Sequence, residues 1–225
     1  MSPSNFPATG FALVPEVFSA AECETLAALA QPSDGASRGT RSLLQQPWCA
    51  ALAERLRAHP VLSALIPADL AAVQCTYFEK SAARNWLVPF HQDLSIPVAE
   101  RVEAPGLRGW SKKEGGLFVQ PPVTLLEQML AVRLHLDACS ENDGPLRVVP
   151  GSHLEGRLEP EGAARARAHG TEVACIADAG AAVVLRPLLL HASSKATGES
   201  RRRVLHFVFG PRELPFGLRW PISTP

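Results

Sequence analysis

The chain has 225 residues, and its 22 Lys and Arg side chains balance 22 Asp and Glu side chains at a sequence pI near 7.1. This length fits a single domain, and it is enough to bury a core without a disulfide or a structural metal. The balanced charge gives no broad electrostatic reason to expect nucleic acid or an anionic membrane as a partner.

The five cysteines are widely spaced and form no C-x-x-C pair. This argues against a disulfide framework and a thiolate zinc site, and it suits a reducing compartment. The N-terminal residues contain no signal-like run, and no apolar run approaches the ~18 residues that a membrane span needs. We therefore expect a cytoplasmic protein of undetermined oligomeric state.

The first 70 residues or so are predicted to be mainly helical. Ser19 is an N-cap candidate before the run AAECETLAALA, and Glu22 supplies the capping-box partner three residues later. An amphipathic pattern predicts a second helix over residues 48–59, and a shorter one follows over residues 60–66.

From about residue 71 to residue 211 the chain is predicted to be a β-barrel core. Short β-rich runs punctuated by Gly, Pro, Asn and Asp occupy residues 73–80, 129–137, 146–151, 172–177, 181–187 and 203–210. Residues 100–122 are rich in Gly and Pro, and a segment of that kind is often a functional lid or a flexible insert. The fold class is therefore α+β, mainly β, with the helices of the N-terminal part packed against one barrel-like core.

The sharpest local feature is the sequence PFHQDL. His91 and Asp93 are two residues apart on an extended segment, so their side chains project to the same side. One imidazole and one carboxylate can hold a divalent metal, and a second histidine would complete the two-His, one-carboxylate set of non-haem Fe(II) oxygenases. By itself, such a pair is more often a surface or hydrogen-bonded pair.

The chain offers several histidines as the third ligand. His191 ends the apolar run LRPLLLHASS, where a strand would deliver it to the rim of a barrel. His135 and His206 lie inside strand candidates and suit satisfied core positions, whereas His153 suits a structural hydrogen bond. The remaining two histidines, His59 and His169, are expected to be solvated.

A run of three arginines, Arg201, Arg202 and Arg203, precedes the last strand candidate. A guanidinium entering the barrel beside a metal would form a fork for a dicarboxylate such as 2-oxoglutarate. Strand alternation lets either Arg202 or its two neighbours point inward, and the spacing does not choose between them. A solvated charge run that closes a turn is the structural alternative.

Three segments of the chain resemble the phytanoyl-CoA dioxygenase family of Fe(II)/2-oxoglutarate oxygenases. They are TYFEKSAARNWLVPFHQDLSIPV, VQPPVTLLEQMLAVRLHLDACSENDGPLRVVPGSH and LLLHASSKATGESRRRVLHFVFGP, in family order between Thr76 and Pro211. The resemblance implies a double-stranded β-helix, that is, a jelly-roll or cupin-like barrel, flanked by helices.

The resemblance also implies roles for individual residues. His91 and Asp93 match the first two iron ligands, and His191 matches the distal one. Arg202 matches the arginine that pairs with the far carboxylate of 2-oxoglutarate, and Ser193 matches a hydroxyl that assists it. Related halogenases replace the carboxylate with a small residue, so the intact Asp93 speaks for hydroxylation. Fe(II), 2-oxoglutarate as cosubstrate and dioxygen are then the expected cofactors.

Substrate contacts are inferred from strand alternation and from position along the chain. Gln74, Thr76 and Phe78 share one face of their strand. Arg133 belongs to a polar face that can line the cavity of an oxygenase, and Gln120 lies on the lid candidate. We therefore expect these five residues to contact the substrate.

The leading hypothesis is an Fe(II)- and 2-oxoglutarate-dependent dioxygenase that hydroxylates a small organic substrate and converts 2-oxoglutarate to succinate. Two alternatives stay open. One is a non-catalytic jelly-roll binding module, and the other is a different metalloenzyme on the same barrel.

Overall fold

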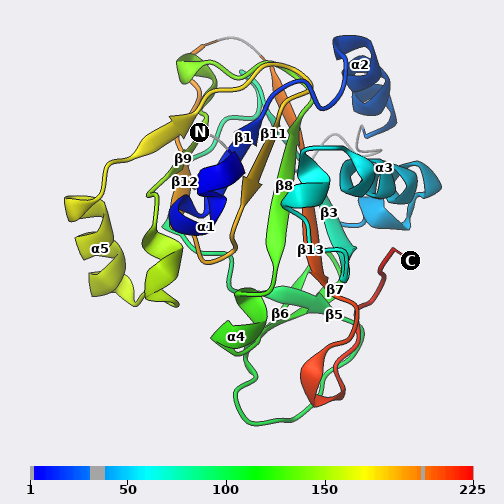
Figure 1. Ribbon diagram of the computed structural model, residues 1–225, viewed down its shortest axis with the longest axis vertical. Coiled ribbons are helices and arrows are strands. Elements are labelled where there is room, and N and C mark those ends of the chain that lie inside the picture. The colour runs from blue at the N-terminus through cyan, green and yellow to red at the C-terminus, as the bar shows by residue number, and fades with distance from the viewer. Residues whose placement is uncertain (1–2, 31–38, 199–200, 225) are drawn as a thin grey trace.

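Two antiparallel sheets face each other and form the body of the molecule (Figure 1). The computed structural model describes residues 3–30, 39–198 and 201–224. The larger sheet has the strand order β1 (Phe11–Val14), β11 (Ala182–Leu185), β8 (Leu130–His135), β13 (Arg202–Pro211), β3 (Leu70–Lys80) and β2 (Gly39–Thr40). The smaller one has the order β10 (Val173–Cys175), β9 (Leu146–Val148), β12 (His191–Ser193) and β4 (Val88–His91).

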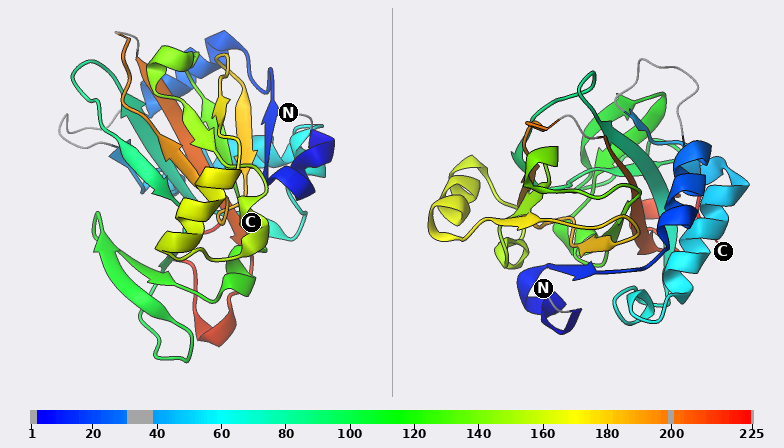
Figure 2. Two further views of the ribbon diagram at one scale, coloured as in Figure 1. Left: turned by 90° about the vertical axis from the view of Figure 1, so that its left-hand side faces the viewer. Right: turned by 90° about the horizontal axis from the view of Figure 1, so that it is seen from above.

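Helices cover the outer face of the larger sheet. Helices α2 (Ala20–Leu29) and α3 (Pro47–Ala58) lie against this face, whereas α5 (Pro160–His169) lies on the opposite side of the molecule (Figure 2). Because strand side chains alternate, Cys75, Tyr77 and Phe207 point outward into the core beneath the helices. The short helices α1 (Phe6–Thr9) and α4 (Val123–Leu126) complete the set of α-helices in the described chain.

The inner face of the larger sheet is apolar at one edge and polar at the other. At the β1–β11 edge, Phe11, Val183 and Leu185 pack against Leu146 and Val148 of the smaller sheet. Towards the other edge, the register of β13 with β3 and β8 aligns polar side chains on the inner face. These side chains are Gln74, Thr76, Lys80, Arg133, Arg202 and His206. The polar half of the space between the sheets is where a site can form.

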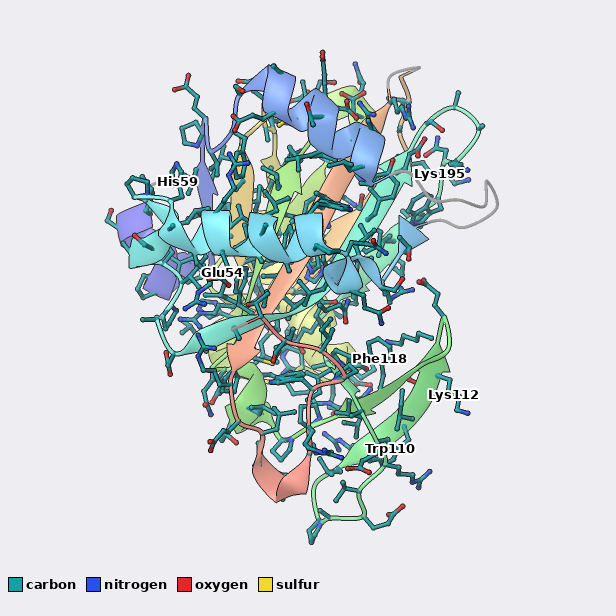
Figure 3. The ribbon with its side chains drawn as sticks, turned by 90° about the vertical axis from the view of Figure 1, so that its right-hand side faces the viewer. Glu54, His59, Trp110, Lys112, Phe118 and Lys195 are labelled. Carbon is teal, nitrogen blue, oxygen red and sulfur yellow. The ribbon has the colours of Figure 1, made fainter. Side chains whose placement is uncertain are left out.

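A third sheet closes one end of the molecule, and it contains much of the segment that was expected to be a lid or an insert. Its order is β5 (Ile96–Val98), β7 (Gly116–Gln120) and β6 (Arg108–Lys113). In Figure 3, Lys112 points away from the body, whereas Phe118 lies against it. Residues 100–122 are thus largely a hairpin with a buried inner side and not an irregular loop.

The helix predictions for the N-terminal part are largely confirmed. The Ser19 hydroxyl accepts a hydrogen bond from the Glu22 amide, and the Glu22 carboxylate accepts one from the Ser19 amide at 2.9 Å. The third predicted helix is only a 3-10 turn, Leu62–Ala64. No helix in the described parts of the chain is long and apolar enough to span a membrane.

Three features of the fold differ from the sequence-based expectation. Strand β1 lies inside the region expected to be helical, because its apolar residues pair along β11. Helix α5 was not predicted; Pro160 begins it, where the missing amide proton costs nothing. The apolar run before His191 is not one strand, since β11 ends at Leu185 and β12 begins at His191.

Candidate active site

A cavity of about 530 Å³ opens between the two sheets, and the third sheet borders it. Side chains of the larger sheet, of β4 and β12, and of the hairpin line it. The described lining includes every residue that the sequence analysis placed in the site: His91, Asp93, His191, Arg202, Ser193, Gln74, Thr76, Phe78, Arg133 and Gln120.

Three of these residues form a compact donor set at one side of the cavity. His91 on β4 and His191 on β12 are direct cross-strand partners. Asp93 lies two residues beyond His91, where β4 ends. The Nε2 atoms of both histidines lie 3.7 Å from the Asp93 carboxylate oxygens. One ligand atom from each residue lies within 4.8 Å of the others, which is compatible with coordination of a single ion.

Backbone carbonyls set the tautomers of both histidines. Nδ1 of His91 lies 2.8 Å from the Pro89 carbonyl, and Nδ1 of His191 lies 2.8 Å from the Leu189 carbonyl. Since a carbonyl only accepts, each Nδ1 carries the proton, and each Nε2 presents its lone pair to the centre of the donor set.

Gln92, the middle residue of the HQD motif, fixes this segment through hydrogen bonds to the backbone of neighbouring loops. Gln92 donates hydrogen bonds to the carbonyls of Leu188 at 2.6 Å and of Gly156 at 2.8 Å. Its amide oxygen accepts a bond from the Leu158 amide at 2.8 Å. Gln92 is buried, so the HQD segment is held to the loop that leads to His191.

Burial and charge together favour the metal-binding protonation states. Burial lowers the pKa of His191, although the Asp93 carboxylate opposes this effect. Burial disfavours the Asp93 carboxylate, yet His191, His206 and His91 together hold its pKa below the ordinary value. These shifts favour an ionised Asp93 and a neutral His191, and a set of one carboxylate and two imidazoles fits Fe(II).

A second polar cluster lines the same cavity and combines Ser193 of the smaller sheet with Lys80 and Arg202 of the larger one. Ser193 donates a hydrogen bond to the Gly144 carbonyl at 2.9 Å and accepts one from Lys80 Nζ at 2.7 Å. Arg202, only 3% exposed, donates to the same carbonyl. Gly144 has a φ of +62°, and a Cβ there would lie 2.4 Å from the Ser194 carbonyl oxygen. Only glycine permits this approach, which positions the hydroxyl and the guanidinium together.

The structure decides which of the three arginines enters the barrel. Arg202 lines the cavity, whereas its neighbours form ion pairs outside it. Arg201 pairs with Glu79 at 3.0 Å, and Arg203 pairs with Asp137 at 2.6 Å. The alternation argument is thereby resolved in favour of Arg202.

Comparison with known proteins identifies the family. The sequence profile described as phytanoyl-CoA dioxygenase (PhyH) matches residues 6–204, which is most of the chain. The chain belongs to the phytanoyl-CoA dioxygenase family. No curated protein sequence is similar enough to count as a relative.

Three solved structures with this fold are described as 2-oxoglutarate-dependent or as containing that cosubstrate. EctD from S. alaskensis, with 2-oxoglutarate and 5-hydroxyectoine, has a TM-score of 0.70 at 19% identity, over 99% of this chain and 83% of that one. SnoK, a carbocyclase from nogalamycin biosynthesis, has a TM-score of 0.67 at 18% identity, over 94% and 83%. HygX from Streptomyces hygroscopicus, with nickel and 2-oxoglutarate bound, has a TM-score of 0.62 at 20% identity, over 92% of this chain and 85% of that one. These likenesses establish the jelly-roll fold.

Sequence reasoning missed two residues of this phytanoyl-CoA dioxygenase-type site. Lys80 is 1% exposed and shares a strand face with Gln74, Thr76 and Phe78, so alternation alone could have found it. Gly144 acts through its backbone carbonyl, which accepts hydrogen bonds from Ser193 and Arg202. The NDGP sequence predicts a turn but gives no indication of these hydrogen bonds.

The two strand histidines are buried, as expected, but they are not satisfied. His206 lines the cavity, with its ring 6.0 Å from that of Phe78 in a T-shaped arrangement. His206 Nδ1 and both ring nitrogens of His135 have no hydrogen-bond partner within the described chain. His153, in contrast, bonds the Pro7 carbonyl through Nε2 at 3.1 Å, as its structural prediction required.

Proposed function

We propose that this protein is an Fe(II)- and 2-oxoglutarate-dependent dioxygenase that hydroxylates a small organic molecule. The observation that carries the proposal is the placement of two complementary groups on one cavity. The His91, Asp93 and His191 donor set presents two Nε2 lone pairs and a carboxylate, and Arg202 with Ser193 presents an anion-binding fork. A five-carbon 2-oxo diacid has matching groups at its two ends.

The residues divide the work of binding between them. His91, Asp93 and His191 would hold the metal, leaving positions open for the cosubstrate and dioxygen. Arg202 and Ser193 would hold the cosubstrate carboxylate that lies farthest from the metal. When bound, the metal and cosubstrate supply the oxidation, in which dioxygen contributes one atom to succinate and one to the substrate, and carbon dioxide leaves.

The remaining lining supports a small and partly polar substrate. Gln74, Thr76 and Phe78 come from the sheet, and Gln120 comes from the hairpin and accepts a hydrogen bond from Arg157 at 3.1 Å. Their mixture of amide, hydroxyl and aromatic groups, in about 530 Å³ shared with the cosubstrate, suits a compact molecule. Closure of residues 100–122 over it stays a prediction.

An anaerobic titration tests this proposal. Addition of Fe(II) and then 2-oxoglutarate to the metal-free protein is expected to produce a visible charge-transfer band that needs both additions. The band should be absent in His191→Ala. A folded wild-type protein that gives no band would contradict the proposal and favour a binding module or a different metalloenzyme.

Hydroxylation itself needs a second measurement. Candidate small molecules should be screened for stimulated succinate release. The product of a positive compound should contain one oxygen atom from isotopically labelled dioxygen.

A further inference from the structure

One buried cation of the cavity has no hydrogen-bond or ion-pair partner among the described residues. Arg133 lies on β8 and is 7% exposed, and its side chain makes no hydrogen bond or ion pair with any other residue that the structure describes. Its only described contact of a directional kind is with the Phe78 ring, whose centroid lies 5.6 Å from the guanidinium carbon. A buried guanidinium without a counter-charge is costly, so its presence points to an anion that enters the cavity.

Within the described parts of the chain, the charges around Arg133 leave no acidic group to serve as that anion. Lys80 and Arg202 are also buried on the same wall. Among the described residues that line the cavity, Asp93 is the single carboxylate, and it belongs to the metal donor set. Three buried cations therefore line a cavity in which the one described carboxylate belongs to the candidate metal donor set.

The position of Arg133 indicates which ligand supplies the anion. Arg133 pairs with His206 on β13, and Arg202 lies on the same face of that strand, towards its beginning. Burial and then the Arg202 guanidinium lower the pKa of Arg133 to about 10, and Arg202 affects it more than Asp93 does. The guanidinium is still charged at neutral pH, and the strand register places Arg133 and Arg202 on the same inner face of the larger sheet, both lining the cavity.

We propose that Arg133 binds the far carboxylate of 2-oxoglutarate together with Arg202, and that it does not bind the substrate. This inference rests on the proposed function, and it revises the substrate role that strand alternation suggested for Arg133. Two guanidiniums and the Lys80 ammonium around one carboxylate make the pocket strongly selective for a 2-oxo diacid over a 2-oxo monoacid.

Binding of two cosubstrates to the nickel-loaded protein tests the proposal without turnover. One is 2-oxoglutarate, and the other is 2-oxopentanoate, which carries a methyl group in place of the far carboxylate. Arg133→Met retains an unbranched apolar stem against Phe78 but removes the charge. We expect calorimetry to show about 10- to 100-fold weaker binding of 2-oxoglutarate, with little change for 2-oxopentanoate.

Thermal unfolding supplies a readout that a structural role would not produce. Because Arg133→Met removes an unpaired buried charge, the ligand-free variant should melt at the wild-type temperature or above it. The control is Arg147→Met. Arg147 does not line the cavity, and it forms an ion pair with Glu172 at 2.7 Å. This control should leave the affinities for both oxo acids unchanged.

The outcomes separate this inference from the proposed function. If wild type and Arg133→Met bound 2-oxoglutarate with equal affinity, the inference would be overturned and the proposed function would stand. The same conclusion would follow if Arg133→Met bound both oxo acids more weakly by the same factor. A nickel-loaded wild type that binds no 2-oxoglutarate would overturn both. If Arg133→Met does not fold, Arg133→Lys replaces it, because this variant keeps the charge with fewer hydrogen-bond donors. The inference then requires a partial loss of affinity for 2-oxoglutarate and no loss of affinity for 2-oxopentanoate.

Discussion

His91 and His191 lie directly opposite each other on the antiparallel strands β4 and β12, with ring centroids 4.3 Å apart. Each ring is oriented by the backbone carbonyl of the residue two positions earlier in the chain. The cross-strand pairing itself therefore brings two Nε2 atoms together, and the Asp93 carboxylate completes the set from the irregular segment that follows β4.

Removal of the carboxylate should abolish metal binding. In Asp93→Ala only two imidazoles remain, so equilibrium dialysis under anaerobic conditions should show loss of stoichiometric Fe(II) binding and of succinate formation. The melting temperature of the metal-free protein should stay close to that of wild type. Asp69→Ala, at an exposed position, is the control, and stoichiometric iron in Asp93→Ala would remove this residue from the ligand set.

Substitution of Arg202 should affect cosubstrate affinity, whereas substitution of Arg203 should affect only stability, because the two side chains face opposite sides of β13. Arg202→Met removes a charge-assisted bond to the cosubstrate and should weaken 2-oxoglutarate binding about 10- to 100-fold. Arg203→Met removes the ion pair with Asp137 and should cost about 1 kcal/mol of unfolding free energy or less. Calorimetry and denaturant unfolding of both variants check this, and the reverse pattern would contradict the cavity-facing placement of Arg202.

Affinity for 2-oxoglutarate should fall as pH rises above about 7. Burial, and then repulsion by Arg202 and Arg133, lowers the pKa of Lys80 to about 7. Only the protonated amine attracts the carboxylate, so binding above this pH requires proton uptake and should weaken by up to about tenfold per pH unit. Lys80→Met should remove this dependence.

The matched control for the Lys80 effect is Lys195→Met. Lys195 is exposed in a neighbouring loop, as Figure 3 shows, and its replacement should leave the pH profile unchanged. A profile that is flat between about pH 7 and 9 in the wild type would contradict the role of Lys80.

Acid should destabilise the protein through a core histidine. Burial, and then the charges of Arg133 and Arg202, lower the pKa of His135 to about 3. An unfolded histidine takes up a proton below about pH 6.5, whereas folded His135 does not until about pH 3. The unfolded state therefore binds more protons between these values, and stability is lost as pH falls.

Denaturant unfolding at about pH 6.5 and 5 measures the effect. His135→Leu should flatten the decline by up to about 1.4 kcal/mol per pH unit. His169→Leu, at an exposed position in α5, should not alter it. An unchanged slope in His135→Leu would show that other groups cause the acid sensitivity.

Some features of the site follow from local sequence alone. The two-residue spacing of His91 and Asp93 places both side chains on one face of any extended segment, whatever the rest of the fold does. The capping box of Ser19 and Glu22 depends only on a three-residue spacing, and the helix begins there as predicted. His191 and Arg202, which the family motifs singled out, both line the cavity.

Tertiary structure decided the rest, because it depends on partners far away in the chain. Alternation allowed either Arg202 or its two neighbours, Arg201 and Arg203, to face inward, and the register of β13 against β3 selected Arg202. The backbone of Gly144 positions Ser193 and Arg202 only because a distant turn packs beneath them. The absence of a counter-charge to Arg133 among the described residues is likewise a property of the assembled cavity, because it depends on which side chains the neighbouring strands bring to the cavity wall.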